Sequence, residues 1–312
     1  MPSESNRLKE AVVCAEKGIS MKKLTILAPA KINLTLDVLA RRADGYHELS
    51  TVMQAISLAD TVMVEAERSH ETVIELTCDK PFVPTDERNI AVKAAKAFLE
   101  KNRMKAHIRI TLQKRIPVGA GMGGGSTDAA AVLRALDTLL PSGMTPDEMV
   151  FLAKSIGADV PFVLRGGCAL AEGIGEALQP IPVYAGIPIV VCKPRVSAST
   201  KEIFTRLKVD SITEHPDTLG AVDAIRERNL DALAFRLFNV LESVTTEICP
   251  VIGEYRRELL KAGALGAAMT GSGTAVFGVF SDKASASCAA AALRHSCDQV
   301  WLAETIGENP AL

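Results

Sequence analysis

The segment PVGAGMGGGSTDAA occupies residues 117–130 and carries the strongest chemical signal in the chain. Its glycines let consecutive backbone N–H groups approach an anion with no side chain between them. Residues 126–128 are of types that cap helices, and the apolar residues beyond them recur at helical spacing, at Ala129, Val132, Leu133, Leu136 and Leu140. A helix that begins here directs the positive end of its dipole at the same anion. The segment therefore predicts a phosphate-binding loop that runs directly into an amphipathic helix.

Two familiar nucleotide-binding loops fit this segment poorly. It is not a Walker A loop, because no lysine precedes Ser126 or Thr127. Residues 119–124 match the G-x-G-x-x-G pattern, but Ile116-Pro117 interrupts the strand that a Rossmann fold places before the glycines. A flexible linker is the remaining alternative, although linkers rarely enter a capped amphipathic helix directly.

A loop of this kind binds phosphate without transferring it. Phosphoryl transfer also needs positive charge at the transition state, a carboxylate that orients or deprotonates the attacking hydroxyl, and usually a divalent metal ion. Because the loop contains no lysine, the cation must come from another part of the chain.

The composition of the 312-residue chain is close to that of an average globular protein, with 48% hydrophobic and 23% charged residues. This length suits one large or two modest domains. A formal net charge of −2 argues against a polybasic nucleic-acid binder, and 4% aromatic residues leave few platforms for stacking single-stranded nucleic acid. We therefore expect no nucleic-acid partner.

Targeting signals are weak throughout the chain. Residues 1–20 lack the apolar stretch of a signal peptide and contain acidic residues that a transit peptide would avoid, so we interpret them as a dispensable extension with Met21 as an alternative start. The uncharged run between Lys261 and Asp282 is rich in glycine and suits a turn between strands better than a membrane helix. The cysteines form no C-x-x-C pair, which favours reduced thiols in a cytoplasmic protein: Cys14, Cys78, Cys168, Cys192, Cys249, Cys288 and Cys297.

Periodicity predicts strands and helices in both halves of the chain. Apolar and polar residues alternate from residue 28 to residue 38, as in a strand with one buried face, and Asp44-Gly45 then predicts a hairpin turn. Further strands are expected near residues 49–58, 60–66, 72–78, 106–112, 168–172, 187–193, 264–281 and 298–304. Helices are expected near residues 89–101, after the glycine-rich segment, after Thr145-Pro146, between 200 and 262, and near 282–295. This arrangement predicts an α+β fold with a domain boundary between about 165 and 180.

Three separated segments resemble the three motifs of the GHMP kinases, the family of galactokinase, homoserine kinase, mevalonate kinase and phosphomevalonate kinase. They are APAKINLTLDV at 28–38, the glycine-rich segment at 117–130, and AAMTGSGTAVFGVF at 267–280. Three more segments resemble the branch that phosphorylates a cytidine diphosphate alcohol in isoprenoid precursor synthesis: RADGYHEL at 42–49, GADVPFVLRGG at 157–167 and AEGIGE at 171–176. The likeness covers nearly all of residues 22–304.

The resemblance implies a two-domain GHMP kinase-like fold with its active site in the cleft between the domains. It places an N-terminal extension at residues 1–21, an ATP-binding domain at 22–170 and a substrate-binding domain at 171–312. It implies ATP and Mg²⁺ as cofactors, a cytidine diphosphate small molecule as substrate, no membrane partner, and a monomer or weak dimer.

Residue by residue, the resemblance assigns Lys31 and Asp159 to catalysis: Asp159 would activate the substrate hydroxyl, and Lys31 would orient it. The ATP phosphates would contact the loop, with Asn89 and Lys114 near the nucleotide. The loop residues are Pro117, Val118, Gly119, Ala120, Gly121, Met122, Gly123, Gly124, Gly125, Ser126 and Thr127. The substrate pocket would include Tyr46 and His47 as readers of cytidine, together with Asn33, Thr200 and Phe204. Thr127 departs from the second serine that is usual in the family but keeps a hydroxyl.

Each assignment has a simpler structural alternative. Lys31 and Asn33 alternate outward on a strand and would form a solvated polar face, while Asp159 would be a turn or cap residue. Tyr46-His47 would merely flank the hairpin, and Phe204 would be helix core. Asp128 would complement the helix dipole, or with Ser126 would contact Mg²⁺. The joint occurrence of these residues at matching positions favours the functional interpretation.

Two further functions are compatible with parts of the pattern. A GHMP kinase for another alcohol, such as homoserine or mevalonate, is disfavoured by Tyr46-His47, because those alcohols have no base to stack. A nucleotide-binding sensor on the same fold would need the loop but not a base, so the presence of both Lys31 and Asp159 argues against it.

Overall fold

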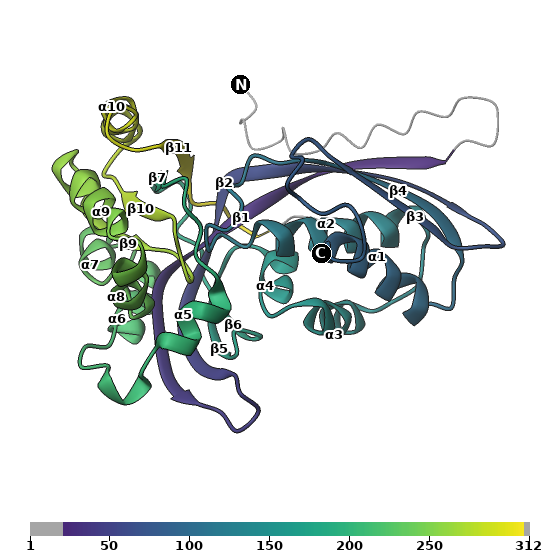
Figure 1. Ribbon diagram of the computed structural model, residues 1–312, viewed down its shortest axis with the longest axis horizontal. Coiled ribbons are helices and arrows are strands. Elements are labelled where there is room, and N and C mark those ends of the chain that lie inside the picture. The colour runs from purple at the N-terminus through teal and green to yellow at the C-terminus, as the bar shows by residue number, and fades with distance from the viewer. Residues whose placement is uncertain (1–20, 309–312) are drawn as a thin grey trace. The chain divides into compact units, whose positions relative to one another are not determined.

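The computed structural model describes residues 21–308, so the extension predicted at residues 1–20 and Cys14 lie outside the described residues. The chain folds into two compact units whose segments alternate along the sequence (Figure 1). Among the described residues, unit 1 contains residues 21–28, Ala59–Arg115 and Gly125–Leu164, and unit 2 contains Pro29–Leu58, Ile116–Gly124 and residues 165–308. This interleaved division into compact units differs from the sequential domains predicted at 22–170 and 171–312. It does not test those domain boundaries, which remain a prediction.

Two long strands give residues to both units. They are β1 (Lys22–Arg41) and β2 (His47–Arg68). The hairpin turn predicted between them is confirmed: the Arg42 N–H donates to the Tyr46 carbonyl at 2.8 Å, and Gly45 has a φ of +88°. The two strands predicted at 49–58 and 60–66 are one strand. The charged residue at their junction, Asp60, is buried, and its carboxylate accepts a hydrogen bond from the Arg115 N–H at 2.5 Å.

The sheet of unit 1 consists of β3 (Val73–Cys78), β4 (Ala106–Gln113) and the distal part of β2. Strand β4 lies between the other two, antiparallel to β2 and parallel to β3. Its alternate residues, starting at Ala106, are buried and the intervening ones are not, as the period of a strand with one core face requires. The strands predicted at 72–78 and 106–112 are therefore confirmed.

The helices of unit 1 are α1 (Ile90–Lys101), α2 (Gly124–Leu139), α3 (Pro146–Ile156) and α4 (Val160–Arg165). Local signals explain two of their starts. The Asn89 side chain accepts from the Ala91 N–H and caps α1. Thr145 and Glu148 form a reciprocal capping box at the start of α3, with Pro146 in the first turn. Helix α1 packs on β3 and on α3 (Figure 1).

Unit 2 contains two sheets. In one, β5 (Cys168–Gly173) pairs with β6 (Ala177–Ile181) and with the proximal part of β2, which is followed by β1 and by the short parallel strand β8 (Phe238–Asn239). The other has the order β11 (Gln299–Glu304), β7 (Pro188–Lys193), β10 (Val276–Val279) and β9 (Gly266–Met269), and all its pairs are antiparallel.

The helices predicted between 200 and 262 are five separate ones, followed by a helix that agrees with the one predicted at 282–295. They are α5 (Thr200–Arg206), α6 (Thr218–Arg226), α7 (Leu230–Phe235), α8 (Leu241–Ile248), α9 (Val251–Lys261) and α10 (Lys283–Leu293), with a 3₁₀ turn at Val209–Ser211. Helix α4 and strands β6 and β8 have no counterpart among the predicted elements.

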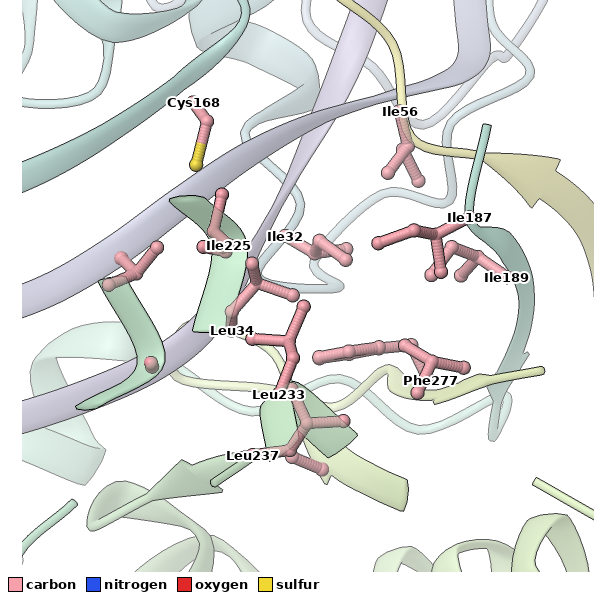
Figure 2. Close-up of a cluster of buried hydrophobic side chains, with 14 of the residues drawn as sticks. Ile32, Leu34, Ile56, Cys168, Ile187, Ile189, Ile225, Leu233, Leu237 and Phe277 are labelled. Carbon is pink, nitrogen blue, oxygen red and sulfur yellow. The ribbon is translucent and has the colours of Figure 1, made fainter. Parts of the chain in front are cut away.

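The four-stranded sheet is buried on both faces. Ile189 and Val191 of β7 join one apolar cluster, which also contains residues of β1, α6 and α7. Phe277 of β10 belongs to the same cluster, and Figure 2 shows it near Ile189. The intervening Val190 and Cys192 join a second cluster with α9 and α10. Burial on both faces explains why β7 reads as a continuous apolar run instead of an alternating one.

The described cysteines Cys78, Cys168, Cys192, Cys249, Cys288 and Cys297 are free thiols. No helix within residues 21–308 is both long enough and apolar enough to cross a membrane. The uncharged run between Lys261 and Asp282 forms β9, β10 and the turn between them, as the sequence predicted.

Candidate functional site

The first part of the glycine-rich segment, residues 116–124, belongs to unit 2. Gly119, Gly121 and Gly123 have φ values of +65°, +73° and +69°, in the left-handed region that glycine adopts without strain. Ala120 and Met122 lie between them, and their side chains are buried in the apolar cluster of β1 and β7. Alternate residues therefore anchor the loop in the core, while the glycines turn the backbone between the anchors.

The third motif packs directly against this loop. A Cβ atom added to Gly121 would lie 2.1 Å from the Thr270 carbonyl oxygen, and one added to Gly271 would lie 2.7 Å from the Gly121 oxygen. The Ala275 N–H donates to the Ala120 carbonyl at 3.3 Å. Gly271 of the third motif therefore lies directly against Gly121 of the loop, and only residues without side chains allow this approach.

The first motif meets the same loop through Lys31 of β1. The Lys31 backbone N–H donates to the Met122 carbonyl at 3.1 Å, and its ammonium donates to Oδ1 of Asn33 at 2.7 Å. The exposed fraction is 4% for Lys31 and 1% for Asn33. The alternative of a solvated polar face is therefore wrong: this face of β1 is buried, and its polar groups bond to one another.

Asn33 joins the first motif to the third. Its backbone N–H donates to the Thr270 hydroxyl at 3.0 Å, and its side-chain amide donates to the Thr51 hydroxyl at 2.8 Å. The Thr270 hydroxyl also lies 3.3 Å from the Gly121 carbonyl, to which it donates. Within unit 2, hydrogen bonds therefore connect all three motifs.

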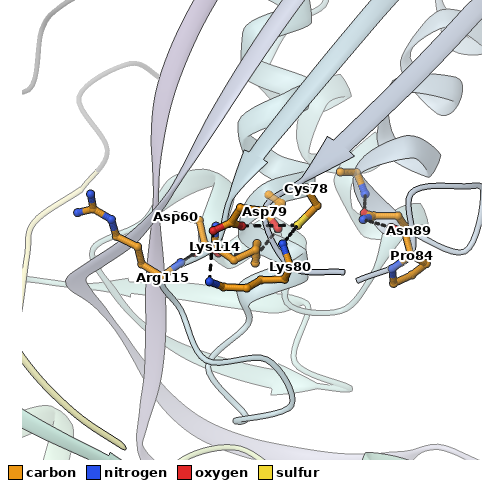
Figure 3. Close-up of polar contacts among 10 residues, drawn as sticks. Asp60, Cys78, Asp79, Lys80, Pro84, Asn89, Lys114 and Arg115 are labelled. Atoms are coloured by element: carbon orange, nitrogen blue, oxygen red, sulfur yellow. Dashed lines mark hydrogen bonds and ion pairs between the residues drawn. The ribbon is translucent and has the colours of Figure 1, made fainter. Parts of the chain in front are cut away.

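The second part of the segment opens helix α2 in unit 1. The helix begins at Gly124, so Ser126 and Thr127 lie in its first turn, Asp128 follows them, and none of the three precedes the helix. Thr127 and Asp128 are buried, and Ser126 is half-buried. The side chain of Asp128 pairs with the Lys114 ammonium, which also pairs with Asp60 (Figure 3).

This buried ion cluster holds one ammonium between two carboxylates. Burial and the neighbouring Asp60 raise the pKa of Asp128 to about 7, although the Lys114 charge acts in the opposite direction. Burial alone would lower the pKa of Lys114, but Asp128 and Asp60 outweigh it and raise that pKa. Lys114 is thus a cation, and a proton on Asp128 neutralises the excess negative charge near neutral pH.

The residues predicted near the nucleotide in unit 1 have structural contacts of their own. Both ends of the Asn89 amide are engaged: its oxygen caps α1, and its nitrogen donates to the Pro84 carbonyl at 2.8 Å (Figure 3). Asp159 is partly buried at the start of α4, where its carbonyl accepts from the Val163 N–H at 3.1 Å. The ligand contacts and the catalytic role assigned to these residues stay predictions.

The aromatic residues predicted to read cytidine lie in unit 2. The rings of His47 and Phe204 have centroids 5.1 Å apart and are inclined by 34°. Partial burial, with a smaller contribution from the charge of Arg41, lowers the pKa of His47 and favours its neutral form. Tyr46 is 60% exposed beside them in the sequence. Thr200 starts the helix that carries Phe204, and its hydroxyl lies 2.8 Å from that of Ser272 in the third motif.

Sequence reasoning missed several residues that organise this site. Thr51 and Thr270 bond to Asn33, and the buried Asn239 side chain donates to the carbonyls of Met269 and Gly271 at 2.8 Å. For Thr270, the only indication of a role in the site was its position inside the third motif. Among the described residues, no three histidine, cysteine, aspartate or glutamate side chains gather as they would around a metal ion.

Comparison with known proteins identifies the family and agrees with the fold. The family model of the GHMP kinases N terminal domain matches residues 89–167, and the GHMP kinases C terminal model matches residues 221–299. The 4-diphosphocytidyl-2-C-methyl-D-erythritol kinase of Acetivibrio thermocellus is 43% identical over 286 residues, which is 92% of this chain and 100% of that protein.

Two solved structures are also similar. A crystal structure of 4-(cytidine 5'-diphospho)-2C-methyl-D-erythritol kinase has a TM-score of 0.77 at 35% identity and covers 91% of this chain and 100% of its own. Homoserine kinase from Cytophaga hutchinsonii has a TM-score of 0.73 at 18% identity, covering 95% and 98% of the two chains, and it shares the fold alone. The predicted mixed α and β fold with two domains is therefore confirmed.

Replacing Gly121 with alanine tests the contact between the loop and the third motif. The left-handed backbone alone costs about 1–3 kcal/mol for a residue with a side chain, and the approach to the Thr270 carbonyl adds to this cost. Gly143→Ala is the matched control, because Gly143 has a similar φ of +74° and nothing within 4 Å of an added Cβ. Urea denaturation should show a clearly larger loss of unfolding free energy for Gly121→Ala, and equal losses would contradict the contact.

Replacing Asp128 with asparagine tests the ion cluster. Because the folded-state pKa of Asp128 lies at about 7, above its ordinary value of 3.8, the folded protein binds the extra proton and loses stability as the pH rises from about 4 to about 7. The span corresponds to at most about 4 kcal/mol. In Asp128→Asn, the pH dependence of the unfolding free energy over this interval should flatten. Asp147→Asn, at an exposed position, should keep the wild-type slope, and an unchanged slope in Asp128→Asn would refute the assignment.

Proposed function

The chain belongs to the GHMP kinase family and, within it, to the 4-diphosphocytidyl-2-C-methyl-D-erythritol kinases, and from this membership we propose that it transfers the γ-phosphoryl group of ATP to the 2-hydroxyl of 4-diphosphocytidyl-2-C-methyl-D-erythritol. The product would be the 2-phosphate, an intermediate of isoprenoid precursor synthesis by the methylerythritol phosphate pathway. The observation that carries the proposal is the hydrogen-bonded junction of Lys31, Asn33, Thr270 and the glycine loop in unit 2.

Each proposed catalytic group has a defined part in the transfer. The substrate hydroxyl oxygen bonds to the γ-phosphorus while the bond from that phosphorus to the bridging oxygen of ADP breaks. Asp159 accepts the hydroxyl proton, and Lys31 orients the hydroxyl and offsets negative charge. Asn33 supports this role because its amide oxygen holds the Lys31 ammonium in place, while the Lys31 backbone N–H bonds to the loop.

The loop fits the phosphates of ATP, since its glycines leave the backbone accessible and its buried anchors hold it in place. A Mg²⁺ ion that accompanies ATP would be held mainly by phosphate oxygens, as is usual for this small, strongly hydrated cation. Near the start of α2, the half-buried Ser126 hydroxyl fits such an ion, whereas the Asp128 carboxylate is buried against Lys114. The ion would neutralise phosphate charge when bound.

The pairing of His47 with Phe204 supports a substrate that carries a base. A flat aromatic group can stack on Phe204 or on the exposed Tyr46, and a neutral His47 can hydrogen-bond to the edge of a pyrimidine. Mevalonate and homoserine have no such ring. We further infer a small-molecule enzyme that acts in the cytoplasm as a monomer or weak dimer without a nucleic-acid or membrane partner. The free thiols and the net charge of −2 support this inference.

Release of ADP from ATP and Mg²⁺ tests the proposed reaction. Turnover should depend on the cytidine diphosphate substrate and should be absent with mevalonate or homoserine in its place. Turnover with one of those alcohols would assign another member of the family, and ATP binding without turnover on any of them would favour a sensor.

Asp159→Asn tests the proposed base. Turnover should fall by about 10²-fold to 10⁴-fold because the proton acceptor is lost, while ATP affinity changes only by a small factor. Asp147→Asn removes an exposed carboxylate from the same unit and should leave the rate unchanged. Steady-state kinetics and calorimetric titration with ATP measure the two quantities, and near-normal turnover of Asp159→Asn would refute the role.

Tyr46→Ala and Phe204→Ala test the reading of cytidine. Loss of a stacking surface should raise KM for the cytidine substrate by about tenfold and leave KM for ATP unchanged. Phe235→Ala is the control, because Phe235 belongs to the same unit and is 88% exposed on α7. If neither variant moves KM for the cytidine substrate, the stacking role is wrong.

A further inference from the structure

Lys193 is a buried cation next to the glycine loop that the mechanism above does not use. It ends strand β7 and is only 3% exposed. Its ammonium donates to the carbonyls of Pro194 and Val196 at 2.9 and 3.2 Å and to the Ser197 hydroxyl at 3.3 Å. These contacts use all three of its donors. Within residues 21–308 it forms no ion pair, and the oxygens that accept its hydrogen bonds are all neutral.

The segment that Lys193 holds lies directly on the loop, within unit 2. A Cβ atom added to Gly119 would lie 2.8 Å from Ser197 Oγ, which places that hydroxyl against the loop backbone. The Thr274 hydroxyl of the third motif donates to the Val196 carbonyl at 2.8 Å and fixes the same segment from another side. Ser197 itself is exposed, so a ligand on the loop can reach it.

The hydrogen bonds of Ser197 determine which kind of group its hydroxyl proton can bond to. Its oxygen accepts from the Lys193 ammonium, and within the described part of the chain the hydroxyl proton has no acceptor. A hydroxyl that accepts a bond from a cation becomes a stronger donor, because hydrogen bonds in a chain polarise one another. The proton is therefore available to an oxyanion that lies on the glycine loop.

We propose that Ser197 donates a hydrogen bond to a phosphate oxygen bound at the loop and that Lys193, behind it, is the positioning residue that orients and polarises this hydroxyl. The inference rests on the proposed function and extends its phosphate site to a second segment of the chain. The ligand is a phosphate oxyanion, either of ATP or of the diphosphate in the second substrate. Lys193 would thus add, through Ser197, to the positive charge that Lys31 brings to the site.

The charge balance at Lys193 fits an incoming anion. Burying an ammonium among neutral groups is costly, and a bound phosphate would offset part of that cost. Burial lowers the pKa of Lys193, while Cys249 after α8 and Asp298 before β11 act in the opposite direction. Arg195 also faces Asp298, at 3.9 Å. The ammonium should therefore lose its proton at a lower pH than an ordinary lysine, and phosphate binding should weaken as it does so.

Ser197→Ala is the direct test, because the exposed hydroxyl can be removed with little risk to folding. Calorimetric titration with ATP and, separately, with the cytidine diphosphate substrate should show about tenfold weaker binding of one of them. Weaker ATP binding identifies the ATP phosphates as the partner, and weaker binding of the second substrate identifies its diphosphate. Arg195→Gln removes a charge from the same segment, 82% exposed at its side chain, and should leave both affinities unchanged. Unchanged binding of both ligands to Ser197→Ala overturns the proposal.

Lys193→Met separates positioning from a purely structural role. In the wild-type protein, affinity for the phosphate ligand should decline as the Lys193 ammonium loses its proton, at a lower pH than an ordinary lysine would cause, because burial lowers its pKa. Lys193→Met should bind the phosphate ligand more weakly at neutral pH and should lose this decline. If Lys193 only supports the segment structurally, affinity should depend on pH in the variant as it does in the wild-type protein. Both tests measure binding and do not require turnover. If the wild-type protein binds ATP without releasing ADP, the proposed function is refuted, and the affinities still decide the role of Ser197.

Discussion

The burial of both faces of β1 is the constraint from which the arrangement of the site follows. The apolar face packs into the core, and the opposite face, with Lys31 and Asn33, is equally closed to water. Polar groups without water must bond to one another, so each side chain of this face has a fixed partner. The partner of Asn33 is Thr270, which in turn bonds to the carbonyl of Gly121. The position of the loop therefore depends on the hydrogen bonds of β1, a strand that is distant from it in sequence.

The buried lysines Lys114 and Lys193 have different surroundings, and this difference distinguishes a lysine that stabilises the fold from one that can act on a ligand. Lys114 has two carboxylate partners, Asp60 of β2 and Asp128 near the start of α2. Lys193 donates its hydrogen bonds only to carbonyl and hydroxyl oxygens, among them Ser197, whose hydroxyl lies against the loop. A cation that is matched inside the protein mainly stabilises the fold, whereas one without an internal anion creates a field that a ligand can use.

Much of the fold could be predicted from local patterns. The Asp44-Gly45 turn, the cap at Asn89 and the start of α3 after Thr145 all depend on residues within a few positions of one another. The single strand β2 could not, because the burial of Asp60 depends on Lys114 and Arg115, which are distant in sequence. Lys31 and Asn33 were identified by family resemblance alone. The alternation of β1 indicated a solvated face, since period-two patterning does not reveal what packs on the polar side.

The bond between the Asn33 N–H and the Thr270 hydroxyl spans 237 positions of sequence. On the ribosome, which adds about 5–20 residues per second, many seconds pass between the emergence of one partner and that of the other. During that interval the polar side of β1 has to remain hydrated or associate with other chains. The nascent chain can pair β2 with β4 early, but it completes the phosphate loop only when synthesis is nearly finished. Assembly of this enzyme is therefore largely a post-translational event.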